Sequence, residues 1–171
     1  DHGLHFEAVV RALRLGFSSV MFDGSTLSYE ENIRQTREVV KMCHAVGVSV
    51  EAELGAVGGD EGGALYGHAD ESLFTDPMLA RDFVDRTGID ALAVAIGNAH
   101  GKYKGEPLLD FPRLDAIRQQ AASPLVLHGG SGISDDDFKR AIELGIHKIN
   151  FYTGMSQAAL PAVEQRMANR Q

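Results

Sequence analysis

Three histidines of this chain stand where predicted strands end and polar loops begin. His2 stands at the start of the sequence, His100 follows the apolar segment 91–96, and His128 ends the segment 124–127. Parallel α/β proteins place their sites at the carboxyl ends of the strands, so these three side chains are expected to converge on one rim. Three neutral imidazoles with one open position form a catalytic zinc site, because the open position takes water or substrate. The pattern therefore indicates a zinc centre, and the other histidines are interpreted as structural.

Two acids are expected on the same rim. Asp23 follows the apolar segment 18–22, and Glu53 lies near the end of the segment 48–54. Carboxylates in such places orient the histidines that bind a metal, or bind a second cation themselves. An acid at the end of a strand can equally be a solvated group without a partner. The sequence supports the two interpretations about evenly.

Two glycine-rich turns follow the last two predicted strands. Residues 128–132 read HGGSG and residues 150–154 read NFYTG. Glycines let backbone N–H groups approach an anion, Ser131 and Thr153 add hydroxyl donors, and the helices that follow direct their positive dipole ends to the same point. The two turns therefore predict a phosphate site beside the histidines.

The elements that must position these residues alternate between short apolar strands and helices. Strands are expected at residues 18–22, 48–54, 91–96, 124–127 and 148–151, and helices at 6–15, 29–46, 77–86, 111–121, 134–144 and 155–167. Strands that are apolar on both faces predict a parallel sheet covered by helices. The α/β pattern predicts a single domain over residues 1–171 with the fold of a (β/α)8 TIM barrel. Such a barrel needs roughly 200 residues or more, so this domain is expected to lack the first strands of the barrel. An open doubly wound sheet fits the same pattern.

The segment from Gly55 to Glu71 departs from this alternation. Glycines and acids dominate it, and it is too long for an ordinary connection between a strand and a helix. We expect a mobile functional loop here, with a disordered insertion as the alternative.

Composition excludes several classes of protein. With 44% hydrophobic and 23% charged residues the chain is typical of globular proteins. The net charge of -8 argues against a nucleic-acid or membrane surface. The single cysteine, Cys43, cannot form an internal disulfide, and no apolar run approaches the ~20 residues of a membrane span. A cytoplasmic location is expected.

Ordered blocks of sequence run along the whole chain. They are DHG at 1–3, SVMFDGS at 19–25, EEN at 30–32, VEAELG at 50–55, GGDE at 58–61, TDP at 75–77, AVAIG at 93–97, HG at 100–101, LHGGSG at 127–132 and KIN at 148–150. Through these blocks the chain resembles the class II, metal-dependent ketose-bisphosphate aldolases, the family of the fructose- and tagatose-bisphosphate aldolases.

The resemblance implies a role for each matching residue. It makes His2, His100 and His128 the zinc ligands, Asp1 the acid that serves the aldehyde half of the substrate, and Glu61 a proton-handling residue on the long loop. The implied substrate-binding residues are Gly101, Gly129, Gly130, Ser131, Asn150, Phe151, Tyr152 and Thr153. Gly58 and Lys104 would lie near a monovalent cation or the phosphate. The barrel fold and a homodimeric or homotetrameric assembly are implied as well.

The implied reaction cleaves a ketose 1-phosphate or 1,6-bisphosphate to dihydroxyacetone phosphate and an aldehyde, or forms the ketose from these two products. It would proceed through a zinc-stabilised enediolate and belong to carbohydrate metabolism, including glycolysis. A TIM-barrel metal-dependent hydrolase is one alternative, although the chain lacks the His-x-His pair expected of it. A non-catalytic barrel that binds sugar phosphates is the other alternative.

Overall fold

The computed structural model describes residues 1–64, 71–103 and 105–169, and within these the side chains of residues 60–64 are not described. Its elements in chain order are α1 (Phe6–Arg14), β1 (Ser19–Phe22), α2 (Tyr29–His44), β2 (Ser49–Leu54), β3 (Gly58–Ala64), the 3-10 helix η1 (Glu71–Leu73), α3 (Pro77–Thr87), β4 (Ala91–Val94), β5 (Ala99–Lys102), α4 (Phe111–Gln120), β6 (Leu125–Leu127), α5 (Asp135–Glu143), β7 (Ile146–Ile149) and α6 (Thr153–Ala168).

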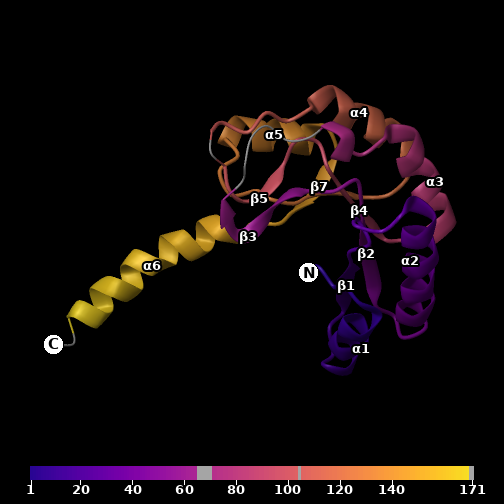
Figure 1. Ribbon diagram of the computed structural model, residues 1–171, viewed down its shortest axis with the longest axis horizontal. Coiled ribbons are helices and arrows are strands. Elements are labelled where there is room, and N and C mark those ends of the chain that lie inside the picture. Colours follow the sequence, from indigo (N-terminus) through magenta and orange to yellow (C-terminus); the bar gives the residue numbers. More distant parts are fainter. Residues whose placement is uncertain (65–70, 104, 170–171) are drawn as a thin grey trace.

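A curved parallel sheet carries the fold. Its strand order is β1-β2-β4-β6-β7, so each strand pairs with the next strand of the alternating series. The connecting helices α2, α3, α4 and α5 follow the outer side of this sheet (Figure 1). Gly3 forms a further parallel bridge to Phe22, which places the first residues alongside β1. The arrangement is part of a (β/α)8 barrel, as the sequence predicted.

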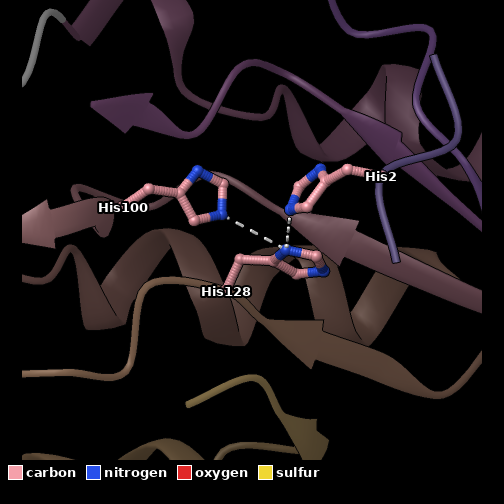
Figure 2. A group of neighbouring side chains, drawn as sticks. All are labelled: His2, His100 and His128. Atoms are coloured by element: carbon pink, nitrogen blue, oxygen red, sulfur yellow. Dashed lines mark hydrogen bonds between the residues drawn. The ribbon is translucent and has the colours of Figure 1, made fainter. Parts of the chain in front are cut away.

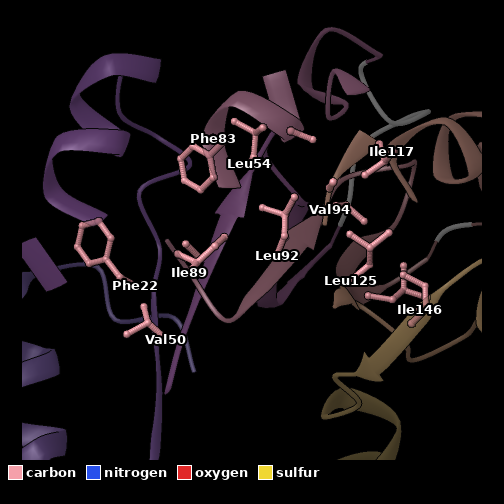
Figure 3. Packing of buried hydrophobic residues seen from close by; sticks show 14 of the residues in the cluster. Phe22, Val50, Leu54, Phe83, Ile89, Leu92, Val94, Ile117, Leu125 and Ile146 are labelled. Carbon is pink, nitrogen blue, oxygen red and sulfur yellow. The ribbon is translucent and has the colours of Figure 1, made fainter. Parts of the chain in front are cut away.

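The main core lies between the sheet and the helices. Val50, Leu92 and Leu125 project from neighbouring strands, and Phe83 of α3 packs in the same cluster (Figure 3). These side chains are essentially inaccessible to water. Truncating a buried leucine of this kind costs roughly 2–5 kcal/mol, so the packing fixes where the strand ends lie.

Local signals explain where several helices begin. The Asp76 side chain accepts hydrogen bonds from the N–H groups of Met78 and Leu79, and Pro77 occupies the first turn of α3. Ser134 caps α5 through the N–H of Asp137. The predicted helix starts at 77 and 111 are confirmed, whereas the last helix begins at Thr153 rather than at residue 155.

A second, two-stranded sheet includes residues 58–64 of the segment from Gly55 to Glu71, for which a mobile functional loop was predicted, so this part of the segment is a strand. Within this sheet, β3 pairs in parallel with β5, and Gly58 and Gly59 stand opposite Ala99 and His100. Strands are predicted from alternating apolar residues, and a glycine-rich segment lacks them. The segment can still form a strand, because strands pair through hydrogen bonds of the backbone. Strand β3 is therefore the hydrogen-bonded neighbour of the strand that carries His100.

The last helix differs from the others. None of the residues of α6 is buried, and the helix extends away from the sheet (Figure 1). Its exposed large apolar side chains include Met155, Leu160 and Val163. None of the described helices combines the length and the apolar composition that a membrane span requires.

Candidate metal centre and anion site

Three histidine rings converge at one rim of the sheet. His2 lies beside the end of β1, His100 lies on β5, and His128 follows β6 directly. His128 Nδ1 lies 2.9 Å from His2 Nε2 and 3.4 Å from His100 Nε2 (Figure 2). Nitrogens bound to one tetrahedral zinc at about 2.0–2.1 Å lie roughly 3.3–3.4 Å apart. The spacing of the three rings therefore fits such an ion after a small adjustment of His2.

Carboxylates fix which nitrogen of two rings faces the centre. Asp23 Oδ2 lies 2.9 Å from His2 Nδ1, and Glu51 Oε1 lies 2.8 Å from His128 Nε2. An ionised carboxylate accepts a hydrogen bond, so it keeps the proton on the nitrogen that it contacts. In the neutral rings, the lone pairs of His2 Nε2 and His128 Nδ1 then face each other. A bound cation would remove the resulting repulsion.

The pKa values of the two acids agree with this assignment. Burial opposes ionisation of Asp23 most strongly, but hydrogen bonds from His2 and Ser25 outweigh it and lower the pKa of Asp23 to about 2. Burial also opposes ionisation of Glu51, and the contacts with His128 and Lys148 lower its pKa nonetheless. Both carboxylates are therefore charged at neutral pH.

Glu51 and Lys148 were not predicted as site residues. The Lys148 ammonium donates to Glu51 Oε2 at 2.5 Å, so one buried carboxylate joins a half-exposed lysine on β7 to the ring of His128. A signal was available in the sequence, because Glu51 and Glu53 are two residues apart and must share a face of their strand. Only the fold reveals that this face of the strand points toward the histidines.

Glu53 is buried on the same face of β2. Its Oε1 accepts a hydrogen bond from the N–H of Val57, whereas Oε2 has no hydrogen-bond partner among the described residues. Burial, followed by the nearby charge of Asp23, raises the pKa of Glu53 to about 7. One ligand atom from each of His2, Asp23 and Glu53 lies within 4.8 Å of the others. Of this group, the two carboxylates of Asp23 and Glu53 could hold a second cation, because His2 Nδ1 contacts Asp23 and His2 Nε2 faces the other histidines.

His2 has a backbone conformation that non-glycine residues rarely adopt. Its φ is 48°, in the left-handed region. The flanking backbone fixes this conformation, since the Gly3 N–H donates to the carbonyl of Met21 and the Asp23 N–H donates to the carbonyl of Gly3. Such strain is found where the surrounding structure holds a functional group in place.

Asp1 and Asn150 meet beside the histidines. The Asn150 side-chain amide donates to Asp1 Oδ1 at 3.0 Å, and the same nitrogen lies 3.1 Å from His128 Nε2. Asp1 is exposed, so its carboxylate can exchange protons with water or with a substrate. The predicted acid thus lies next to the predicted ligands.

A cavity next to the histidines brings the two glycine-rich turns together. It is lined by Asp1, His100, Gly101, Gly129, Gly130, Ser131, Ile149, Asn150, Phe151, Tyr152 and Thr153, which include all eight residues expected to bind substrate. Helix α6 begins at this cavity, so the positive end of its dipole faces the lining.

The hydrogen bonds of the turns identify which groups remain for an anion. The N–H of Gly154 donates to Ser131 Oγ at 2.8 Å, which leaves the Ser131 hydroxyl hydrogen able to donate. The N–H of Gly130 is already used, because it donates to the carbonyl of Asn150. Gly130 therefore holds the two turns together rather than offering its amide to a ligand.

Three other predicted positions remain, and the structure describes them to different extents. Glu61 belongs to β3, and its side chain lies outside the described part of the structure. Lys104 also lies outside the described residues. Gly58 pairs with Ala99, one residue before His100.

Comparisons with known proteins identify the family to which the chain is similar. A family model for class II fructose-bisphosphate aldolase matches residues 1–171. The YdjI aldolase from Escherichia coli K12 has a similar structure, with a TM-score of 0.84 and 47% sequence identity over 98% of this chain and 57% of that chain. A fructose-bisphosphate aldolase from Campylobacter jejuni matches with a TM-score of 0.76 and 28% identity over 99% of this chain and 56% of its own. This chain thus spans a little more than half the length of either aldolase.

Proposed function

Because this chain belongs to the class II fructose-bisphosphate aldolase family, we propose that it acts in a zinc-dependent aldehyde-lyase on phosphorylated ketoses. The substrate would be a ketose 1-phosphate or 1,6-bisphosphate, and cleavage would give dihydroxyacetone phosphate and an aldehyde. The observation that carries the proposal is the convergence of three imidazoles beside a cavity formed by two glycine-rich turns.

The proposed zinc ligands are His2 Nε2, His100 and His128 Nδ1. Asp23 and Glu51 support this choice, since each holds a proton on the nitrogen that faces away from the centre. Zinc would act as a Lewis acid that stabilises negative charge developing on the oxygens of the substrate.

The phosphate of the substrate is proposed to lie in the cavity between the turns. The Ser131 hydroxyl and the N-terminal end of α6 would hold it, with Thr153 as the first residue of that helix. Phe151 and Tyr152 line the cavity and are about half exposed, so they are proposed to border the rest of the substrate.

Proton transfers are proposed for two acids. Asp1, oriented by Asn150, would exchange a proton with the hydroxyl that becomes the aldehyde oxygen. Glu61 would serve the carbon next to the ketone, and the segment that carries it would exclude water. Lys148 is not proposed as a nucleophile, because its ammonium is engaged by Glu51.

Further parts of the proposal concern other ions, the assembly and the location. Asp23 and Glu53 would bind a second cation, and Gly58 and Lys104 would lie near a monovalent cation or the phosphate. A homodimer or homotetramer is proposed from the family resemblance. A cytoplasmic location is proposed because the chain has a single cysteine.

The test measures zinc content and cleavage on the same preparation. We expect the purified protein to release dihydroxyacetone phosphate from a phosphorylated ketose, to stop after chelation and to resume when zinc is returned. His100→Ala should lose both zinc and cleavage. His44→Ala is the matched control, because His44 pairs with Asp90 on the surface and belongs to none of the candidate metal-binding groups among the described residues.

Two results would overturn the proposal. Release of inorganic phosphate without cleavage of the carbon chain would identify a hydrolase. A zinc-loaded protein that binds sugar phosphates but neither cleaves them nor forms them would be a binding protein.

A further inference from the structure

One side chain joins the segment that carries His100 to the turn that follows His128. The Tyr103 hydroxyl accepts a hydrogen bond from the N–H of Ala99 at 2.7 Å and donates to the carbonyl of Gly129 at 3.0 Å. Ala99 precedes His100, and Gly129 follows His128. The two bonds therefore connect the backbones on either side of two proposed zinc ligands.

The same contact reaches the anion site. The peptide unit between Gly129 and Gly130 is held at both ends, because its carbonyl accepts from Tyr103 and its N–H donates to the carbonyl of Asn150. The two backbones are close enough that a Cβ on Gly129 would lie 2.1 Å from the carbonyl oxygen of Ala99. A small movement at this contact would shift the His100 strand and the glycine turn together.

The hydroxyl and the ring of Tyr103 make separate contributions. Burial raises the pKa of Tyr103, and the bond from Ala99 only partly offsets that effect, so the hydroxyl stays protonated and can donate at neutral pH. The ring packs against Gly132, where its Cδ2 would lie 3.1 Å from an added Cβ. Phenylalanine at this position would keep the packing and lose only the two hydrogen bonds.

We propose that Tyr103 is a positioning residue, whose hydroxyl sets the spacing between the strand that carries His100 and the turn at Gly129. Through this spacing it tunes the affinity for zinc and the affinity for phosphate together. This inference rests on the proposed function, since it assumes that the histidines bind zinc and that the turns bind phosphate. Nothing in it requires Tyr103 to touch the metal or the substrate.

The experiment compares Tyr103→Phe with Tyr29→Phe. Tyr29 is a matched control, because its hydroxyl also makes two hydrogen bonds, to Leu79 and Asp82, but it joins α2 to α3 instead of the site turns. Zinc affinity would be measured by competition with a chromophoric chelator, and inorganic phosphate binding by titration of the zinc-loaded protein. Hydrogen exchange of the Ala99 amide would be followed in the metal-free protein.

Tyr103→Phe should weaken zinc binding by roughly 10-fold, the lower end of what groups supporting metal ligands contribute. It should also weaken phosphate binding and speed exchange at Ala99, whereas Tyr29→Phe should leave all three unchanged. The KM for a phosphorylated ketose should rise more than kcat falls, because the substrate's phosphate is bound by the displaced turn.

Failure of the inference differs from failure of the proposed function. If the wild-type protein binds zinc and cleaves a phosphorylated ketose, but Tyr103→Phe matches it in zinc and phosphate affinity, then the positioning role is refuted and the function stands. Equal changes in the two tyrosine variants would also refute it, since they would reflect general stability. A wild-type protein without zinc binding would overturn both.

Discussion

Replacing Glu51 with glutamine should weaken zinc binding while leaving the fold in place. Glu51 accepts hydrogen bonds from His128 at 2.8 Å and from Lys148 at 2.5 Å, and glutamine keeps its size but not its charge. A neutral amide oxygen can still accept from the ring, but it no longer makes the nitrogen opposite more basic. Loss of such a carboxylate lowers metal affinity by roughly 10–100-fold, or about 1.4–2.7 kcal/mol.

The assay is a zinc titration against a competing chelator at neutral pH and constant ionic strength. Glu30→Gln is the control, because Glu30 is an exposed carboxylate that pairs with Arg86 on the helical surface. Circular dichroism and thermal unfolding of the metal-free proteins would report whether the fold is intact. A folded Glu51→Gln protein whose zinc affinity is within about twofold of wild type would refute the role assigned to this carboxylate.

Three further outcomes are expected. The pKa of Glu53 rises from 4.5 to about 7 on folding, so between these pH values the folded state binds more protons than the unfolded state. The metal-free protein should therefore lose on the order of 3 kcal/mol of its free energy of unfolding as the pH rises from 4.5 to about 7. Chemical denaturation across pH should show this loss in wild type and not in Glu53→Gln. Asp1→Ala should reduce cleavage roughly 10²–10⁴-fold but retain more of the exchange of the dihydroxyacetone phosphate proton with solvent, whereas Glu61→Ala should depress both equally. An Asp1→Ala protein that still holds zinc but loses exchange and cleavage equally would contradict this division. Gly129→Ala should lower the melting temperature and phosphate affinity, because the residue has a φ of 65° and its Cβ would meet the Ala99 carbonyl at 2.1 Å; wild-type values for both would contradict the close contact.

The sequence predicts the main sheet because its strands are buried on both faces. The apolar run around Leu92 and Ala93 illustrates this, since Leu92 faces the helices and Ala93 packs with Val126 on the other side. The position of His128 could also be predicted, because it directly follows an uninterrupted apolar strand. Parallel strand ends share one rim, so strand prediction was enough to place His128 and the glycine turn after it at that rim.

The remaining features depend on pairings that no local pattern specifies. Strands β3 and β5 are too rich in glycine and polar residues to show alternation, and they follow β2 and β4, which are neighbours in the main sheet. Lys148 contacts Glu51 across 97 residues of sequence, and the contact depends on the order of the strands. A sequence gives the types of such residues, whereas the register of the sheet decides which of them meet.

The histidine centre also bears on the order in which the chain folds. His2 and His128 are separated by 126 residues, yet their ring nitrogens lie 2.9 Å apart. Closing so long a loop costs chain entropy that only the assembled sheet can offset, because the strands between them set the distance. We therefore expect the two rings to meet late, after the intervening strands have paired, so that a metal ion would bind the folded sheet rather than nucleate it. Zinc uptake during refolding should accordingly lag behind the recovery of helical structure.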